Sequence, residues 1–217
     1  PMENTVYFLP NSDARQSQIY FYIPMGDYNR EENVRREAFN QYISGGFSGL
    51  IMNEIREKNS MAYTAYGFAS SRGLPGAQTY FSGYIGTQND KAVDAIDLYM
   101  KLLTDMPERP GRIDNIKSYL RQSALTDHPD SRNLSLRIAE WKRRGYTDDP
   151  AKEELPLIDS LTFPDIVDYY QKNIKGKPII IGVLGNPKDI SIDALKKFGK
   201  VIRLNEKKLF NEKDTMF

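Results

Sequence analysis

The chain has 217 residues, of which 40% are hydrophobic and 27% charged, and this composition suits one globular domain. Thirty basic and twenty-nine acidic residues give a formal charge of +1, which excludes the basic footprint of a dedicated nucleic-acid binder. The absence of cysteine excludes disulfides, thiolate metal sites and a cysteine nucleophile, and it suits the cytoplasm and the periplasm equally. We predict a single domain over residues 1–217 that has no nucleic-acid partner.

The apolar runs are short, as at 179–184, and none is long enough to cross a bilayer. No basic segment followed by an apolar stretch opens the chain, so we expect a soluble protein without a membrane span. A strand-like segment begins almost directly after Pro1, which suggests a chain cut from a longer precursor.

Two strands open the predicted fold. Residues 5–9 and 18–23 are rich in Val, Ile, Tyr and Phe, and the turn-forming cluster 10–13 separates them, so we expect two adjacent strands. Apolar residues at spacings of three and four predict a helix over 31–43, and the glycine pair beginning at Gly45 ends it.

A second helix and a long hairpin follow. Ser48 is predicted to cap a helix over 49–58. Residues 61–70 and 78–87 then alternate as half-buried strands, and the loop between them holds Arg72, which we expect to face solvent.

The second half of the chain is mainly helical. Helical spacing predicts helices over 90–103, 111–126 and 133–144, and a fourth helix begins at Thr162, its predicted N-cap. Residues 177–185 are continuously apolar, which predicts a strand buried on both faces.

A short helix near 192–198 and a strand near 200–204 complete this order. It predicts an α+β fold with a mainly antiparallel sheet packed against helices on one face.

The catalytic groups of most hydrolases are missing from the sequence. The chain has one histidine, His128, in the loop-like segment 126–130, where a solvated turn residue is the simplest interpretation. A zinc site of the H-E-x-x-H or H-x-x-E-H type needs a second histidine, so we expect no metal site in this chain. No serine stands in a nucleophile elbow, and no phosphate-binding glycine motif is present.

Arg56 and Tyr63 are the strongest candidates for a chemical role. The arginine falls at the end of a predicted helix, and the tyrosine falls seven residues later at the start of a strand. Both side chains can donate hydrogen bonds to one peptide carbonyl or developing oxyanion. Two structural alternatives stay open, because Arg56 can complement its helix dipole and Tyr63 can be an ordinary strand aromatic.

Three segments together resemble one known family. They are the glycine-rich helix entry 45–50, the stretch from Ile55 through Tyr63, and the strand segment 84–87. In these segments the sequence is similar to the pitrilysin-type, or M16, zinc metallopeptidase family, and the similarity extends over nearly the whole chain.

The resemblance implies the C-terminal, zinc-free half of a peptidase. In this family a homologous N-terminal half carries an inverted H-x-x-E-H zinc site, and the two halves close a chamber around peptide substrates. Arg56 and Tyr63 match the arginine and tyrosine that reach across to that site, and no position of this chain matches the zinc ligands. We therefore expect zinc in the partner half and no cofactor here.

Other roles remain open for individual residues and for the chain. Phe47 and Ser48 are candidates for substrate contact, with core packing and helix capping as the alternatives. The chain is either part of an active metallopeptidase, a separately encoded partner subunit, or a non-catalytic subunit that resembles the core proteins of respiratory complexes. The residues upstream of Pro1 distinguish these three cases.

Overall fold

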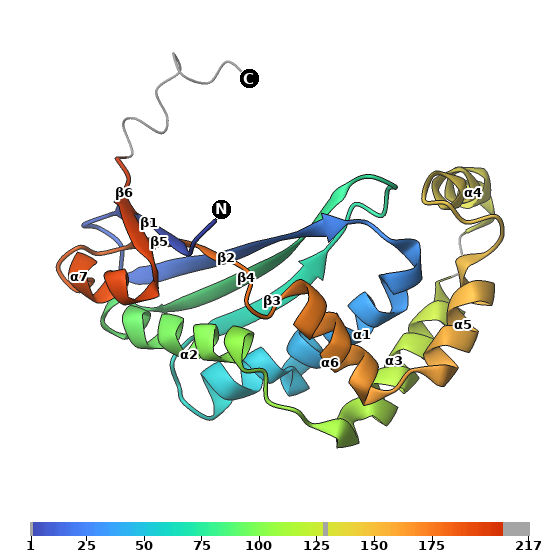
Figure 1. Ribbon diagram of the computed structural model, residues 1–217, viewed down its shortest axis with the longest axis horizontal. Coiled ribbons are helices and arrows are strands. Elements are labelled where there is room, and N and C mark those ends of the chain that lie inside the picture. The colour runs from blue at the N-terminus through green and yellow to red at the C-terminus, as the bar shows by residue number, and fades with distance from the viewer. Residues whose placement is uncertain (1, 128–129, 206–217) are drawn as a thin grey trace, which may run out of the picture.

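The computed structural model describes residues 2–127 and 130–205. In this part of the chain, six strands form one sheet in the order β3-β4-β2-β5-β1-β6 (Figure 1). The strands are β1 (Thr5–Pro10), β2 (Gln16–Asp27), β3 (Thr64–Ser70), β4 (Gln78–Gln88), β5 (Ile180–Gly185) and β6 (Lys200–Arg203).

The helices lie between β2 and β3, between β4 and β5, and before β6. They are α1 (Asn33–Ser44), a π-helical segment (Met52–Glu57), α2 (Ala92–Thr104), α3 (Ile113–Thr126), α4 (Leu134–Arg143), α5 (Pro150–Ser160), α6 (Phe163–Asn173) and α7 (Ile192–Leu195). No described helix is long and apolar enough to cross a membrane.

The α+β class and the helix-backed sheet predicted from the sequence are confirmed. Antiparallel pairing joins three of the five neighbouring strand pairs in the described sheet, and β1 is parallel to both β5 and β6. The prediction that the first two strands are adjacent is wrong. Strand β5 lies between them, parallel to β1 and antiparallel to β2, because the chain returns to the sheet centre after its long helical excursion.

The prediction that β5 is buried on both faces is also wrong. Ile181 and Val183 are buried, whereas Ile180 and Leu184 are partly exposed. The helices α1, α2 and α6 cover one face of the sheet, and no described helix covers the other (Figure 1). Because helices cover only one face of this sheet, even its central strands leave side chains on the other face partly exposed.

Helix α2 packs against the covered face through Tyr99. The Tyr99 ring stacks on Phe21 with centroids 4.0 Å apart, and its hydroxyl donates to the Tyr66 carbonyl oxygen at 2.9 Å. Gly67 and Gly83 are register partners on β3 and β4, and a Cβ at either would overlap the Tyr99 hydroxyl oxygen. Two glycines therefore make the space that α2 needs.

Helix α1 satisfies the backbone of the edge strand β3. The Asn40 amide accepts a hydrogen bond from the Ala69 N–H at 2.7 Å and donates to the Ala69 carbonyl at 3.0 Å. Ser44 accepts from the Gly67 N–H at 2.8 Å. Side chains of α1 thus form hydrogen bonds with backbone groups of β3 that could otherwise pair with a strand of another chain.

The outer helices include one that the sequence did not predict. Helix α5 begins after Asp149, whose carboxylate accepts from the Ala151 N–H at 2.9 Å, and it contains Pro156, which in a sequence indicates a helix end. Helix α6 begins as predicted, because Thr162 and Asp165 form a capping box.

Candidate functional site

Arg56 lies on the π-helical segment that follows the glycine-rich turn. Ile51 and Ile55 are fully buried and fix this segment to the core. The Lys58 N–H donates to the Asn53 carbonyl at 3.0 Å, five residues back, so the backbone is wider here than in an α-helix. The Arg56 side chain is 44% exposed, and its Nε lies 3.7 Å from a Glu57 carboxylate oxygen, which is too long for a hydrogen bond.

The loop after this segment folds back onto it. The Ser60 N–H donates to the Arg56 carbonyl and the Met61 N–H to the Ile55 carbonyl, each at 2.9 Å. Ser60 has a φ of 50°, in the left-handed region that a serine adopts only under local constraint. Thr87 also donates from its hydroxyl to the Met61 carbonyl. These bonds keep the end of the helix close to the start of β3.

Tyr63 lies where this loop meets the sheet. Its N–H donates to the Gly86 carbonyl at 2.9 Å, and its side chain is 53% exposed. The Gln88 side-chain amide donates to the Tyr63 hydroxyl oxygen at 3.0 Å. Because this bond uses a lone pair of the phenol oxygen, the hydroxyl hydrogen stays available for another acceptor.

The two predicted residues therefore lie at the same end of β3, both at the surface. Within the described residues they share no hydrogen bond. Their arrangement offers a fixed positive charge and a phenol donor to a group that approaches this end of the sheet. Gln88 was missed by sequence reasoning, because its contact with Tyr63 comes from the pairing of β4 with β3 and no local motif indicates it.

Glu54 fixes the π-helical segment to the loop after α2. Its carboxylate pairs with Lys58 at 2.9 Å and with Arg109. Partial burial by itself raises the pKa of the Glu54 carboxyl, but the Lys58 ammonium and the Arg109 guanidinium outweigh that effect and hold the pKa below its ordinary value. The carboxylate is thus ionised and pairs with both cations, which offsets one of their two positive charges beside Arg56.

The remaining predicted residues are only partly described. Ser48 is exposed, and its hydroxyl donates to the Gly45 carbonyl at 3.2 Å, so the predicted cap of the following helix does not form. Arg72 is exposed, as predicted. The side chain of Phe47 and the whole of His128 lie outside the described part of the structure.

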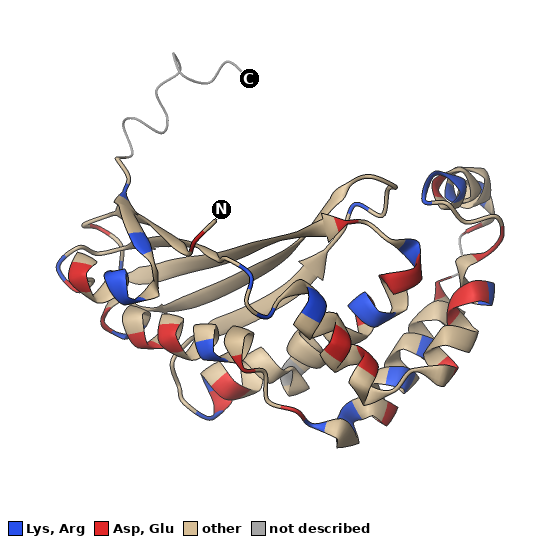
Figure 2. Cartoon of the chain, viewed as in Figure 1, with Lys and Arg blue, Asp and Glu red and all other residues tan. Residues whose placement is uncertain are grey.

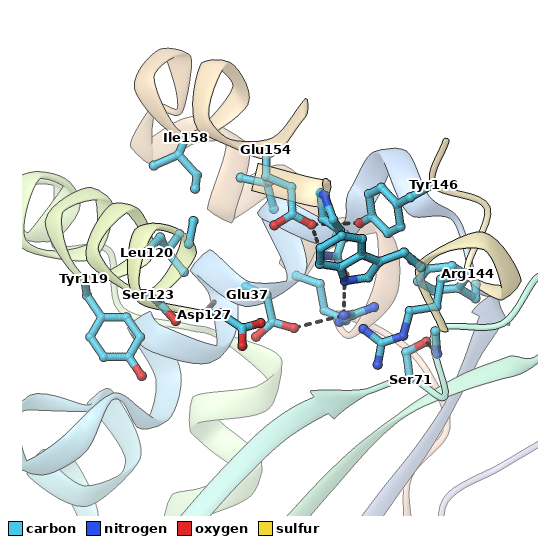
Figure 3. Close-up of a pocket in the computed structure, with 18 of the residues that line it drawn as sticks. Glu37, Ser71, Tyr119, Leu120, Ser123, Asp127, Arg144, Tyr146, Glu154 and Ile158 are labelled. Atoms are coloured by element: carbon cyan, nitrogen blue, oxygen red, sulfur yellow. Dashed lines mark hydrogen bonds and ion pairs between the residues drawn. The ribbon is translucent and has the colours of Figure 1, made fainter. Parts of the chain in front are cut away.

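A separate cavity of about 400 Å³ lies at the other end of β3, among α1, α3, α4 and α5 (Figure 3). Strand β3 has seven residues, which at about 3.4 Å each separate this cavity from Tyr63 by roughly 24 Å. Arg144 lies beside Ser71 of the hairpin loop, and Glu154 and Tyr146 lie next to each other in the cavity wall (Figure 3).

The charged groups of this cavity neutralise one another. Arg137 pairs with Asp127, and Arg144 pairs with Glu140 at 3.2 Å. The Tyr146 hydroxyl donates to Glu154 at 2.7 Å. Burial and the Glu154 charge both raise the pKa of Tyr146, so the phenol stays protonated. The cavity therefore joins the outer helices to the body of the domain through satisfied polar contacts.

The described residues contain no group of three or more His, Asp or Glu side chains that could hold a metal ion. Residues of this chain therefore do not fit a catalytic zinc site in the part that the structure describes. The expectation of zinc concerns a homologous half and stays a prediction.

The fold is that of an α+β domain with helices on one face of its sheet. Its candidate site consists of two hydrogen-bond donors, Arg56 and Tyr63, at one end of the hairpin that β3 and β4 form. The chain belongs to the family described as Peptidase M16 inactive domain, whose model matches residues 3–111, just over half of the sequence. The resemblance found in the sequence is thereby confirmed. No curated protein matches the chain significantly.

Solved structures share the fold at low sequence identity. A peptidase M16 inactive domain from Pseudomonas fluorescens has a TM-score of 0.70 and 15% identity, covering 85% of this chain and 44% of that chain. The periplasmic protease PqqL from Escherichia coli has a TM-score of 0.64 and 15% identity, covering 86% of this chain and 21% of that chain.

A chain of complex III2 from Candida albicans has a TM-score of 0.64 and 14% identity, covering 86% of this chain and 46% of that chain. The present chain thus spans less than half the length of each of these three solved chains.

Proposed function

We propose that the chain is the C-terminal half of a zinc-dependent M16-type metalloendopeptidase. In this role it closes the peptide-binding chamber against a homologous zinc-bearing half and supplies Arg56 and Tyr63 to the zinc site of that half. The observation that carries the proposal is the exposure of both side chains at one end of β3, with the Tyr63 hydroxyl hydrogen available.

Each residue of this chain would act on a peptide held by both halves. Zinc bound in the other half would polarise the scissile carbonyl and activate a water molecule. The Arg56 guanidinium would bind a substrate carbonyl or the developing oxyanion with a charge that does not titrate. Tyr63 would donate its hydroxyl hydrogen to the same region, and the Gln88 amide would orient that phenol.

The test uses the complete protein that contains both halves, with the variants Arg56→Ala and Tyr63→Phe. We expect kcat to fall by about 100-fold or more for each variant, the cost of removing one oxyanion donor. Zinc content should stay at the wild-type value, because neither residue is expected to ligate the metal. Peptide turnover and metal analysis on the same preparations provide both readouts.

Arg72→Ala and Tyr119→Phe are matched controls, since both residues are exposed and lie away from the proposed site. Their kcat should equal that of the wild type. Unchanged kinetics in both Arg56→Ala and Tyr63→Phe would assign the pair to helix-dipole and strand roles instead.

The structural likeness to a chain of complex III2 favours a second candidate, a non-catalytic M16-like subunit that pairs with a homologous half. A separately encoded heterodimer partner is a variant of the first proposal. A zinc motif upstream in the same reading frame, with measurable turnover, would support the peptidase. A degenerate zinc motif upstream, in a complex that does not hydrolyse peptides, would support the non-catalytic subunit.

A further inference from the structure

The turn between Arg56 and Tyr63 holds one residue in an unfavourable backbone conformation. Ser60 has a φ of 50°, and in the described part of the chain it is the one residue other than glycine with a positive φ. In this left-handed region the Cβ of an L-residue approaches the following carbonyl oxygen, so glycine is the usual occupant. Such a conformation persists where the surrounding contacts hold it, and it occurs often at functional sites.

Contacts on one side tie this turn to the π-helical segment. The Ser60 N–H donates to the carbonyl of Arg56 at 2.9 Å, and the Asn59 side-chain amide donates to the carbonyl of Glu54 at 2.6 Å. A helix leaves its last carbonyls without partners inside the helix. The bond from Ser60 to the carbonyl four residues back is the one that a left-handed residue makes at a helix C-terminus.

Contacts on the other side tie the same turn to the end of β4 and the residues after it. The Ser60 carbonyl accepts a hydrogen bond from the Lys91 ammonium at 3.3 Å, and the Met61 carbonyl accepts one from the Thr87 hydroxyl. Ser60 therefore lies between two sets of contacts, one to the helical segment and one to the hairpin.

These contacts set the separation of Arg56 and Tyr63. Seven residues of extended chain would span up to roughly 25 Å. Here the chain folds back on the helix, because Ser60 and Met61 both donate to helical carbonyls, and the Tyr63 N–H then reaches the Gly86 carbonyl at 2.9 Å. Since the Ser60 N–H bonds the carbonyl of Arg56 itself, a change in the Ser60 conformation moves Arg56 relative to Tyr63.

Strands β3 and β4 supply no charge at this end of the sheet. Neither contains a charged residue, and in Figure 2 the strands are tan along nearly their whole length while the helices carry blue and red. The cation of the candidate site therefore comes from the π-helical segment, and the turn at Ser60 connects that segment to the strand. A displacement of about 1 Å in a substrate-binding group can lower a rate about 100-fold, so the shape of this turn affects the proposed chemistry.

We propose that Ser60 is a positioning residue, whose left-handed backbone conformation orients the Arg56 segment against Tyr63 so that both donors reach one substrate group. The contacts of Ser60 given above are made by its N–H and its carbonyl, so the backbone conformation and not the hydroxyl carries this role. The inference rests on the proposed function for the chemistry of the pair.

Two substitutions separate the backbone conformation of Ser60 from its hydroxyl. Ser60→Thr keeps a hydroxyl and adds a β-branch, which makes a positive φ less favourable. Ser60→Gly removes the hydroxyl and adopts a positive φ freely. In the complete protein that contains both halves, we expect Ser60→Thr to lower kcat about threefold to tenfold with zinc content unchanged, and Ser60→Gly to keep kcat within about twofold of the wild type.

A double variant tests whether Ser60 acts through Arg56. In the Arg56→Ala background the group that the turn orients is gone, so adding Ser60→Thr should lower kcat by less than about twofold further. A general structural defect would instead lower kcat by the same factor in both backgrounds.

Amide hydrogen exchange on the same preparations measures the turn directly. After correction for sequence, the Met61 amide, which donates to the Ile55 carbonyl, should exchange about threefold to tenfold faster in Ser60→Thr and at the wild-type rate in Ser60→Gly. Slow exchange in α2 establishes that each variant is folded. Ser135→Thr is the matched control, because Ser135 is exposed on α4, and both its kcat and its Met61 exchange should equal those of the wild type.

Four results would overturn the inference. They are wild-type kcat and exchange in Ser60→Thr, equal losses in Ser60→Thr and Ser60→Gly, an equal loss in Ser135→Thr, and full additivity of Ser60→Thr with Arg56→Ala.

The positioning role and the proposed function fail separately. Wild-type turnover in both Arg56→Ala and Tyr63→Phe would remove the proposed function, and the exchange rates would then decide by themselves whether Ser60 holds the two segments together. Turnover that depends on Arg56 but is unchanged in Ser60→Thr would keep the proposed function and overturn the positioning role.

Discussion

The two faces of the sheet come from alternate residues of the same strands, yet they differ in every respect that matters for function. Phe21 is 1% exposed and stacks on Tyr99, whereas its neighbour Tyr20 is 51% exposed, with its ring 5.1 Å from that of Tyr84 and its hydroxyl donating to Gln18. The covered face combines buried aliphatic and phenylalanine side chains with glycines that make room for α2. The open face carries tyrosines and Phe68 on strands that hold few charged residues. The difference indicates that the helices stabilise the fold through the covered face.

The largest expected difference between the two faces is the difference in stability loss between Phe21→Ala and Tyr20→Thr. Removing the buried Phe21 ring leaves a cavity beneath Tyr99, so we expect the free energy of unfolding to fall by about 3–5 kcal/mol. Tyr20→Thr removes only an exposed cross-strand ring contact and should cost less than about 1 kcal/mol. Urea unfolding at neutral pH measures both values. Equal losses would mean that the open face also holds the fold together.

Glycine substitutions compare the faces with a single added methyl group. In Gly83→Ala the new Cβ overlaps the Tyr99 hydroxyl, and the resulting displacement of α2 should cost about 1–3 kcal/mol. In Gly182→Ala the new Cβ meets only the Tyr20 Cβ at 3.8 Å, an ordinary van der Waals contact. We expect that control to be neutral or slightly stabilising. A Gly83→Ala chain as stable as the wild type would show that the packing of α2 does not depend on a glycine at position 83.

Among the substitutions on the covered face, Tyr99→Phe gives the smallest expected loss of stability at neutral pH and a distinctive effect in alkali. Burial raises the pKa of the Tyr99 phenol well above its ordinary value, and the nearby Tyr66 adds to the shift. Because the folded pKa is the higher one, stability is complete below about pH 10 and falls as pH rises above the unfolded pKa.

The phenylalanine variant should lose about 1 kcal/mol at neutral pH with its hydrogen bond to the Tyr66 carbonyl. Its stability should then fall less steeply than that of the wild type above about pH 10. Unfolding free energies measured across this range check the slope. Parallel slopes for the two proteins would contradict the assignment of the alkaline loss to Tyr99.

Local features of the fold were predictable because they depend on neighbouring residues. Alternation predicted the half-buried strands β3 and β4, and the capping residues of α6 fixed its start. The Arg56 and Tyr63 pair was recognisable for the same reason, since a helix end and a strand start can be located from short segments. Helix α5 was not predicted, because Pro156 indicates a break when its neighbours are unknown.

By itself, the sequence determined the order of the elements apart from α5, the half-buried alternation of β3 and β4, and the family to which the chain belongs. Only the tertiary structure decided that β5 lies between β1 and β2, that Gln88 contacts the Tyr63 hydroxyl, and that tyrosines from the four strands β1, β2, β3 and β4 lie on one face of the sheet. Periodicity depends on residues a few positions apart, whereas strand order and shared faces depend on contacts between distant segments. These long-range contacts set the lateral neighbours of Tyr20.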